Sequence, residues 1–349
     1  MRRSIVFSFF FFLLSSKAFG QSPFSADVDS LIHRGIDQTY NSEFDSALAT
    51  FQKIVDAHPD HIAGYFYQAA VLQSQMMDYE TDLWEEEFYA WINKAIEIGS
   101  AQIEGGDANA WTRFYMGSCH SYKGLYQAKA GGLISGIKSA RKGLACFSEA
   151  IEMDSTLYDA YLGIGNYKYW SGKFYKFFRW LPWISDERDE GVLLVILSIN
   201  RGMFSHWVGI NSLAWIEYDR KQYASALGHF LSGLERYPKS RFFLWGAADA
   251  YFQLGIYDKA AEIYEELLVS IRNGLLNNGY NEVICRFKLV KTYFAQQRYE
   301  DALHHCDAIL KIETDAKIAK KIKERREKTE DYRRKCIQAI KREAKTADQ

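Results

Sequence analysis

Two stretches of this chain repeat one pattern of residue types at an offset of 34 residues. The alignment pairs Ala214 with Ala248, Ala226 with Ala260 and Phe230 with Tyr264. Small residues let two antiparallel helices approach closely, and aromatic rings fill the space to the next unit. One such unit cannot bury its apolar face alone, so several must stack. The repeat therefore predicts an all-α fold, an α-α superhelix.

The 34-residue period resembles the tetratricopeptide repeat, in which a small residue, an aromatic residue, an alanine, a second aromatic residue and a proline recur in this order. Further copies of the pattern occur at Gly35, Phe44, Ala47, Phe51 and Pro59, at Phe147 to Gly165, and at Leu289, Tyr293, Tyr299, Ala302 and Ile309. The resemblance implies a solenoid that binds protein partners, and it implies no enzyme.

The regular units flank an irregular middle. We expect a repeat domain over residues 21–312 with about seven helical pairs, and enlarged central repeats whose long second helices run around 84–103 and 122–151. An insertion at 171–189 separates the two helices of the fourth unit, and the stretch Asn273 to Asn281 supplies a longer loop. A charged helix within residues 313–349 is then expected to cap the open end of the solenoid.

The first 20 residues are typical of a signal peptide. Arg2 and Arg3 precede a ten-residue apolar run, and Ala18-Phe19-Gly20 places small residues before a cleavage site at Gly20/Gln21. The run is well short of the ~20 residues that span a bilayer. The sequence therefore predicts an exported, periplasmic protein, with a retained anchor as the less favoured alternative.

Charge and cysteine content narrow the function classes. Residues 311–349 carry 14 Lys and Arg against 8 Asp and Glu, whereas the whole chain has 43 against 44, so the preceding body is acidic. An acidic body and an export signal disfavour a nucleic-acid partner. The five cysteines form no Cys-x-x-Cys motif and are expected to be buried hydrophobic residues; a Cys119–Cys146 bridge requires neighbouring helices.

No residue set predicts catalysis, a metal site or a cofactor. His304, His305 and Cys306 are adjacent in sequence, and neighbours on a helix diverge by about 100°, so they cannot all face one ion. Gly131-Gly132 lacks the lysine and the strand of a phosphate loop. We therefore expect no catalytic residues.

The insertion is rich in aromatic and basic residues. Internal packing of these rings is favoured because the insertion lies inside a repeat. Contact with a membrane surface or with a partner stays open, since Trp and Phe interleaved with lysines suit both. The residues that would make this contact, within the segment 167–183, are Phe174, Phe177, Phe178, Trp180 and Trp183. Leu181-Pro182-Trp183 and the acidic stretch after it are similar to a bacterial tetratricopeptide family with such an insert, although Ser185 replaces its glycine. They are also faintly similar to the eukaryotic inclusion-body-clearance and outer-membrane tetratricopeptide proteins.

The concave surface of such a superhelix is lined by the first helices of the pairs. Counting from the small residues predicts a partner-binding groove lined by Asn166, Tyr169, Asn211, Trp215, Tyr218, Trp245, Asp249, Phe252 and Lys291. Aromatic rings with a few polar tips suit peptide recognition. Equally, these rings could simply fill a tightly wound interior. The leading functional hypothesis is a non-catalytic scaffold in the cell envelope, and the alternative is a peripheral membrane protein that uses the insert.

Overall fold

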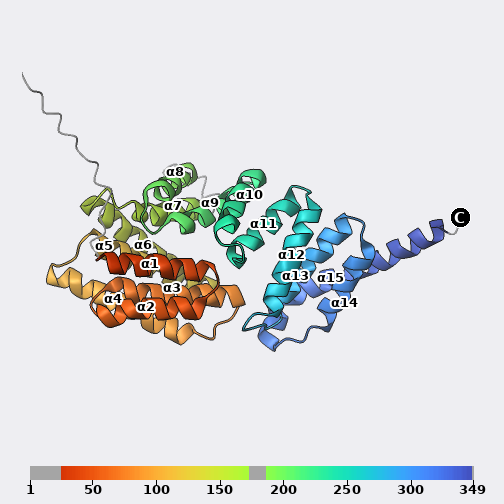
Figure 1. Cartoon of the computed structure of the whole chain (residues 1–349), viewed down its shortest axis with the longest axis horizontal. Helices are drawn as coiled ribbons and strands as arrows, with labels where there is room; N and C mark the ends of the chain where they lie inside the picture. The colour runs from red at the N-terminus through yellow and green to blue at the C-terminus, as the bar shows by residue number, and fades with distance from the viewer. Residues whose placement is uncertain (1–24, 173–185, 348–349) are drawn as a thin grey trace, which may run out of the picture.

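The computed structural model describes residues 25–172 and 186–347, and this part of the chain is built from α-helices (Figure 1). Seven antiparallel pairs are followed by one long helix. The pairs are α1 (Ala26–Tyr40) and α2 (Phe44–Ala57), α3 (Ile62–Tyr79) and α4 (Glu85–Gly105), α5 (Ala110–Lys129) and α6 (Leu133–Met153), α7 (Tyr158–Gly172) and α8 (Arg188–Arg201), α9 (His206–Asp219) and α10 (Tyr223–Arg236), α11 (Arg241–Gln253) and α12 (Tyr257–Arg272), and α13 (Tyr280–Ala295) and α14 (Tyr299–Lys311), and the last helix is α15 (Ala316–Ala347). The described chain is the predicted all-α superhelix.

The repeat positions form the core between neighbouring helices. Ala214, Ala226, Ala248 and Ala260 have no exposed surface, and neither has Phe230. A methyl group on Gly246 of α11 would lie 2.2 Å from the Phe230 ring, so only glycine lets α11 pack on α10 at this point. The small and aromatic residues therefore recur because each ring needs a hole on the next helix.

The third unit corrects one expectation. The sequence predicts a single second helix over 122–151, but the chain breaks at residues 130–132 and folds back as the hairpin of α5 and α6. Gly131 adopts a φ of +94°, a conformation that L side chains rarely accept. The Ala-Gly-Gly sequence thus ends α5, and the unit is enlarged by two long helices of similar length.

The last helix covers the end of the solenoid. Ile318, Ile322, Thr329 and Cys336 recur on one side of α15 and are all buried. The helix packs against α13 and α14, where Ile318 and Ile322 share an apolar cluster with Val283, Val290, Cys306 and Ile309. The final repeat would otherwise present this apolar surface to water, so α15 is the predicted cap.

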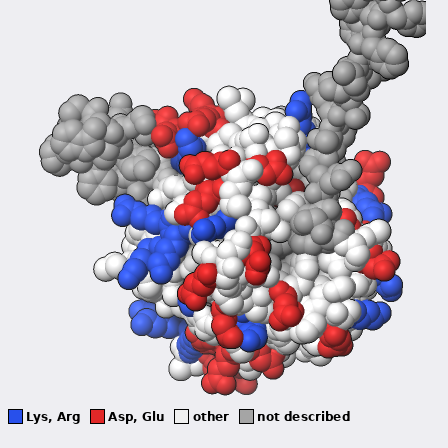
Figure 2. Space-filling view, turned by 90° about the vertical axis from the view of Figure 1, so that its left-hand side faces the viewer, with Lys and Arg blue, Asp and Glu red and all other residues white. Residues whose placement is uncertain are grey.

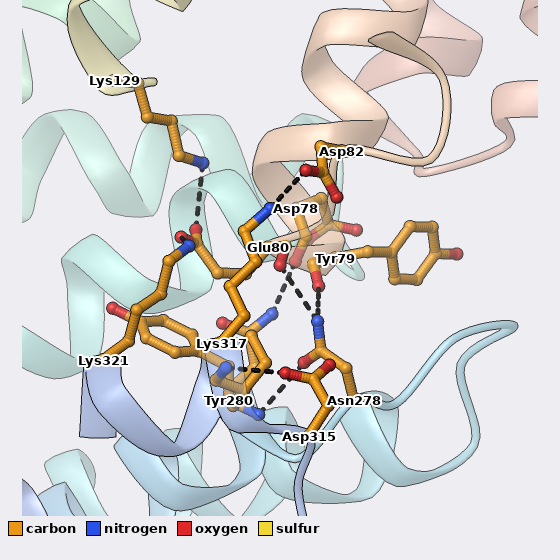
Figure 3. Close-up of polar contacts among 12 residues, drawn as sticks. Asp78, Tyr79, Glu80, Asp82, Lys129, Asn278, Tyr280, Asp315, Lys317 and Lys321 are labelled. Carbon is orange, nitrogen blue, oxygen red and sulfur yellow. Dashed lines mark hydrogen bonds and ion pairs between the residues drawn. The ribbon is translucent and has the colours of Figure 1, made fainter. Parts of the chain in front are cut away.

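The C-terminal end of α3 is bound by residues far along the chain (Figure 3). Arg241, at the start of α11, donates from Nε to Asp78 at 2.8 Å, and both side chains are buried. Its guanidinium also lies 5.1 Å from the centre of the Tyr79 ring. Asn278 and Asn281, before and within the first turn of α13, donate to backbone carbonyls of α3 and its end at 2.9 and 2.6 Å.

Lysines complete this contact. Glu80 accepts from Lys321 of α15 and from Lys129 of α5, both at 2.9 Å, and Asp82 pairs with Lys317 (Figure 3). Burial alone would raise the pKa of Glu80, but hydrogen bonds from the two lysines hold it below its ordinary value. We call residues 78–82 with their partners Arg241, Asn278, Asn281, Lys317 and Lys321 the closing contact.

A second contact joins α1 to the turn between α10 and α11. The ring of Tyr40 stacks on Tyr237 and Phe243, with centroids 5.3 and 5.4 Å apart. Arg236 donates to Asp37 at 2.8 Å, next to the hydroxyl of Tyr237. The first helices of the N-terminal pairs therefore pack against the chain's own later units.

Candidate partner-binding surface

The predicted groove residues lie on successive first helices, at matching positions. Asn211, Trp215 and Tyr218 occupy positions i, i+4 and i+7 of α9, and Trp245, Asp249 and Phe252 occupy the same positions of α11. Residues at this spacing share one face of a helix. All six are half-buried, so each side chain packs at its base and leaves part of its surface accessible.

Aromatic contacts fix the rings on α9. Trp215 meets Phe230 edge-on at a centroid distance of 5.1 Å and Tyr218 at 5.6 Å. Tyr218 also contacts Tyr223, and its hydroxyl oxygen accepts a hydrogen bond from Gln253 at 3.3 Å. These rings are held by neighbours on α10 and α11, so a ligand would meet them already ordered.

A charged pair joins α11 to α13. Lys288 Nζ lies 2.5 Å from a carboxylate oxygen of Asp249, and the hydroxyl of Tyr264 donates to the same oxygen. Burial and then the charge of Asp249 raise the pKa of Tyr218 to about 12, so this phenol stays protonated. The repeat pattern does not single out Lys288. Its contact has a counterpart in an earlier repeat, where Ser212 of α9 donates to Asn166 on the preceding first helix, α7.

Lys291 is the cation of this surface that forms no ion pair with a residue in the described ranges. Its Nζ lies 4.6 Å from the centre of the Phe252 ring, a cation–π distance. Burial, followed by the charge of Lys288, lowers the pKa of Lys291; the charge of Asp249 opposes this shift, and Arg325 and Lys328 of α15 add to it. An anionic group placed beside Lys291 would favour its charged form.

The family follows from a profile match. Residues 211–274, which span α9 to α12 and carry most of this surface, match the tetratricopeptide repeat. This chain therefore contains tetratricopeptide repeats. No protein with curated annotation matches it significantly.

Solved structures share the fold of this tetratricopeptide-repeat protein at low sequence identity. The anaphase-promoting complex hetero-tetramer Cut9–Hcn1 matches with a TM-score of 0.56 and 14% identity, over 90% of this chain and 53% of the other. The human IFIT1 dimer with m7Gppp-AAAA matches with a TM-score of 0.52 and 15% identity, over 86% of this chain and 60% of the other. The C-terminal part of a repeat protein of Cytophaga hutchinsonii gives 17% identity over 83% and 98% of the chains, with a TM-score of 0.43. At these identities the likeness to the first two structures shows the fold alone, and this chain spans little more than half of each.

One predicted groove residue of the tetratricopeptide-repeat protein is placed wrongly. Tyr169 is completely buried, and its hydroxyl donates to Asp219 at 2.9 Å and to the carbonyl of Ile216. The ring therefore joins α7 to α9 in the core and is not available to a partner. Asn211 differs: its side-chain oxygen is buried without a hydrogen-bond partner in the described chain. The insert residues Phe174, Phe177, Phe178, Trp180 and Trp183 lie outside the described residues, as do residues 1–20 with the predicted signal peptide, so both assignments stay predictions.

A cavity of the described chain lies elsewhere. It has a volume of about 500 Å³ and is lined by the turn 57–62 and by the start of α5. Its polar groups serve the fold: Asn109 and Thr112 cap α5, and Gln102 bridges Thr112 to the carbonyl of Asp60. Nothing in this lining assigns a ligand.

The histidine–cysteine stretch is structural. His305 is buried, with its ring nitrogens 3.3 Å from Arg286 and 3.1 Å from Glu265, and it stacks on Tyr293. Cys306 is fully buried, and burial raises its pKa to about 12. All five cysteines are free thiols, including Cys119 and Cys146 on the neighbouring helices α5 and α6. Within the described ranges no helix is long and apolar enough to cross a membrane.

Proposed function

We propose that this protein is a non-catalytic scaffold that binds an extended peptide or a protein segment along α9, α11 and α13, in the cell envelope to which its signal peptide would direct it. The observation that carries the proposal is the row of half-buried rings on successive first helices, which ends at Lys291 without an acidic partner in the described chain. Rigid aromatic rings offer large contact area at little entropic cost.

The chemistry of the row specifies the ligand. Trp215, Tyr218 and Phe252 suit aliphatic or aromatic side chains, and Lys291 suits a carboxylate, either a side chain or a chain terminus. A peptide that crosses from α9 to α13 would meet both the aromatic rings and Lys291.

Site-specific photo-crosslinking in the native cells tests this proposal. A benzophenone amino acid at position 252 is expected to capture a partner, and one at Leu231, an exposed residue of α10, is expected to capture none. Lys291→Glu should lower capture by about tenfold through charge reversal, whereas Lys291→Arg should retain it. Equal capture from positions 252 and 231, or capture that Lys291→Glu leaves unchanged, would exclude this surface.

A further inference from the structure

The tip of the α5–α6 hairpin exposes large aliphatic side chains. Ile134 is 86% exposed, and Leu125, Leu133 and Ile137 are 53%, 53% and 45% exposed. Leu125 lies in the last turns of α5, and the other three occupy the first turns of α6. Single exposed aliphatic residues are ordinary, but four near the tip of one hairpin, three of them within five residues of α6, form a patch that calls for a partner.

These side chains are exposed because the hairpin is packed by glycines. A methyl group on Gly124 would lie 2.8 Å from the carbonyl oxygen of Gly136, and one on Gly143 would lie 2.9 Å from that of Gly117. The two backbones are thus in direct contact, which small residues alone permit. No space remains between the helices for a leucine or isoleucine, so these residues point outward.

The hairpin is also the most basic part of the repeat domain. Residues 108–148 contain six Lys and Arg and no Asp or Glu, although the body of the chain is acidic. Lys138, Arg141 and Lys142 are exposed and make no ion pair with a described residue. Burial, and then Lys142 and Lys123, lower the pKa of the nearby His120. Figure 2 looks onto the end of the molecule that carries α4 to α6 in Figure 1, and basic side chains gather there on one side.

The order of these residues along α6 matches the depth profile of a bilayer surface. At 1.5 Å per residue, the aliphatic residues occupy the first ~6 Å of the helix and the cations the next ~8 Å. Interfacial segments bury apolar groups about 5–10 Å deep and leave their cations at the headgroups. A rotation of 100° per residue places Ile134, Lys138 and Arg141 on one face of α6.

We propose that the tip of the α5–α6 hairpin binds the surface of an anionic lipid membrane. Leu133, Ile134 and Ile137 enter the boundary between headgroups and acyl chains, and Lys138, Arg141 and Lys142 contact the headgroup phosphates. Lipid is favoured over an acidic protein because exposed aliphatic side chains lie at the very end of the hairpin and exposed cations follow them along α6. This membrane contact is separate from the partner row on α9 to α13.

Flotation with vesicles tests the proposal on the mature protein. Vesicles of 30% phosphatidylglycerol in phosphatidylcholine should carry the protein to the top of the gradient, and vesicles of phosphatidylcholine alone should carry much less. Ile134→Asp should reduce the bound fraction by about tenfold, because an exposed isoleucine is lost and an anion is added. Val269→Asp, which changes another exposed aliphatic residue, on α12, is the control and should bind like the wild type.

Three results would overturn the proposal. Binding that Ile134→Asp and Lys138→Glu leave unchanged would exclude the hairpin, and binding lost only in the Trp180→Ala, Trp183→Ala variant would assign the contact to the insert. A dimer that Ile134→Asp dissociates in light scattering, without vesicle binding, would assign the patch to a second copy. Circular dichroism of every variant, expected to be unchanged at such exposed positions, keeps loss of binding distinct from loss of fold.

Discussion

At the scale of single residues, the buried pair of Asp78 and Arg241 is the costliest contact to break. Both side chains are nearly inaccessible, at 3% and 7% exposure, and they come from helices 163 residues apart. Two buried charges stabilise little when paired, but one left alone is expensive. The pair therefore specifies which helix ends meet more than it adds to the free energy of unfolding.

Asp78→Asn should destabilise the protein by about 3–5 kcal/mol, because it leaves the guanidinium of Arg241 buried without a counter-charge. The double variant Asp78→Asn, Arg241→Met should recover a large part of this loss. Urea unfolding measures both. Glu97→Gln, which breaks the exposed pair with Lys94, is the control and should cost less than about 1 kcal/mol. A double variant as unstable as the single one would contradict this account.

At the scale of elements, the α5–α6 hairpin shows how two helices pack without large side chains. Its contacts run through glycine backbones, so any added atom must separate the helices. Gly228 of α10 has no such role, because a methyl group on it would meet nothing within 4 Å. The same substitution should therefore have opposite effects at the two sites.

Gly136→Ala should destabilise the protein by about 1–3 kcal/mol, because its new methyl group lies 2.8 Å from the carbonyl oxygen of Gly124. Gly228→Ala should stabilise it by about 0.5–1 kcal/mol, since alanine favours a helix interior. Thermal unfolding of both variants compares them directly. Equal shifts of either sign would mean that helix propensity alone, and not the close approach of α5 and α6, decides the outcome.

At the scale of the whole molecule, the closing contact depends on carboxylates. The pKa of Glu80 is held below its ordinary value of 4.5 in the folded state, so its contribution to stability is complete above that value and is lost as the pH falls through the folded pKa. The charge that opposes Lys321 and Lys129 then disappears. The superhelix should loosen at acidic pH.

We expect the difference in melting temperature between the wild type and Glu80→Gln to be constant from pH 7 to 5 and to shrink below about pH 4. Small-angle scattering should show a larger radius of gyration for Glu80→Gln at pH 7. A difference in melting temperature that does not shrink at any pH below 4.5 would mean that the ionised carboxylate does not stabilise the closing contact.

The repeat architecture could be predicted from sequence because it is local. Ala214, Ala226 and Phe230 recur at a fixed offset, and each packs on the adjacent helix, so the pattern and the contact share one period. The row on α9 and α11 follows from the same count. The same count wrongly places Tyr169 in the groove. Its hydroxyl instead donates to Asp219 on the next first helix, α9, and the ring is buried.

The remaining features have no local signature. In the sequence, Gly131 belongs to a Gly-Gly pair without the other residues of a phosphate loop, and its positive φ, which allows the hairpin turn, is visible only in the structure. Arg241 follows its partner Asp78 by 163 residues, and Lys321 follows its partner Glu80 by 241 residues. No periodic pattern in the sequence connects positions so far apart. Long-range polar contacts of this kind depend on the curvature of the whole superhelix, which small differences at each unit determine.

The closing contact also determines the order in which a newly synthesised chain can complete its fold. The carboxylates at the end of α3 leave the ribosome long before Lys321, which follows Glu80 by 241 residues. At 5–20 residues per second this interval is roughly 10–50 s. The first pairs can stack as they emerge, yet their inner faces wait for the last helix. Folding of this protein is therefore completed only when α15 is present. A chain truncated before α15 would lack the contact between Lys321 and Glu80 at the end of α3.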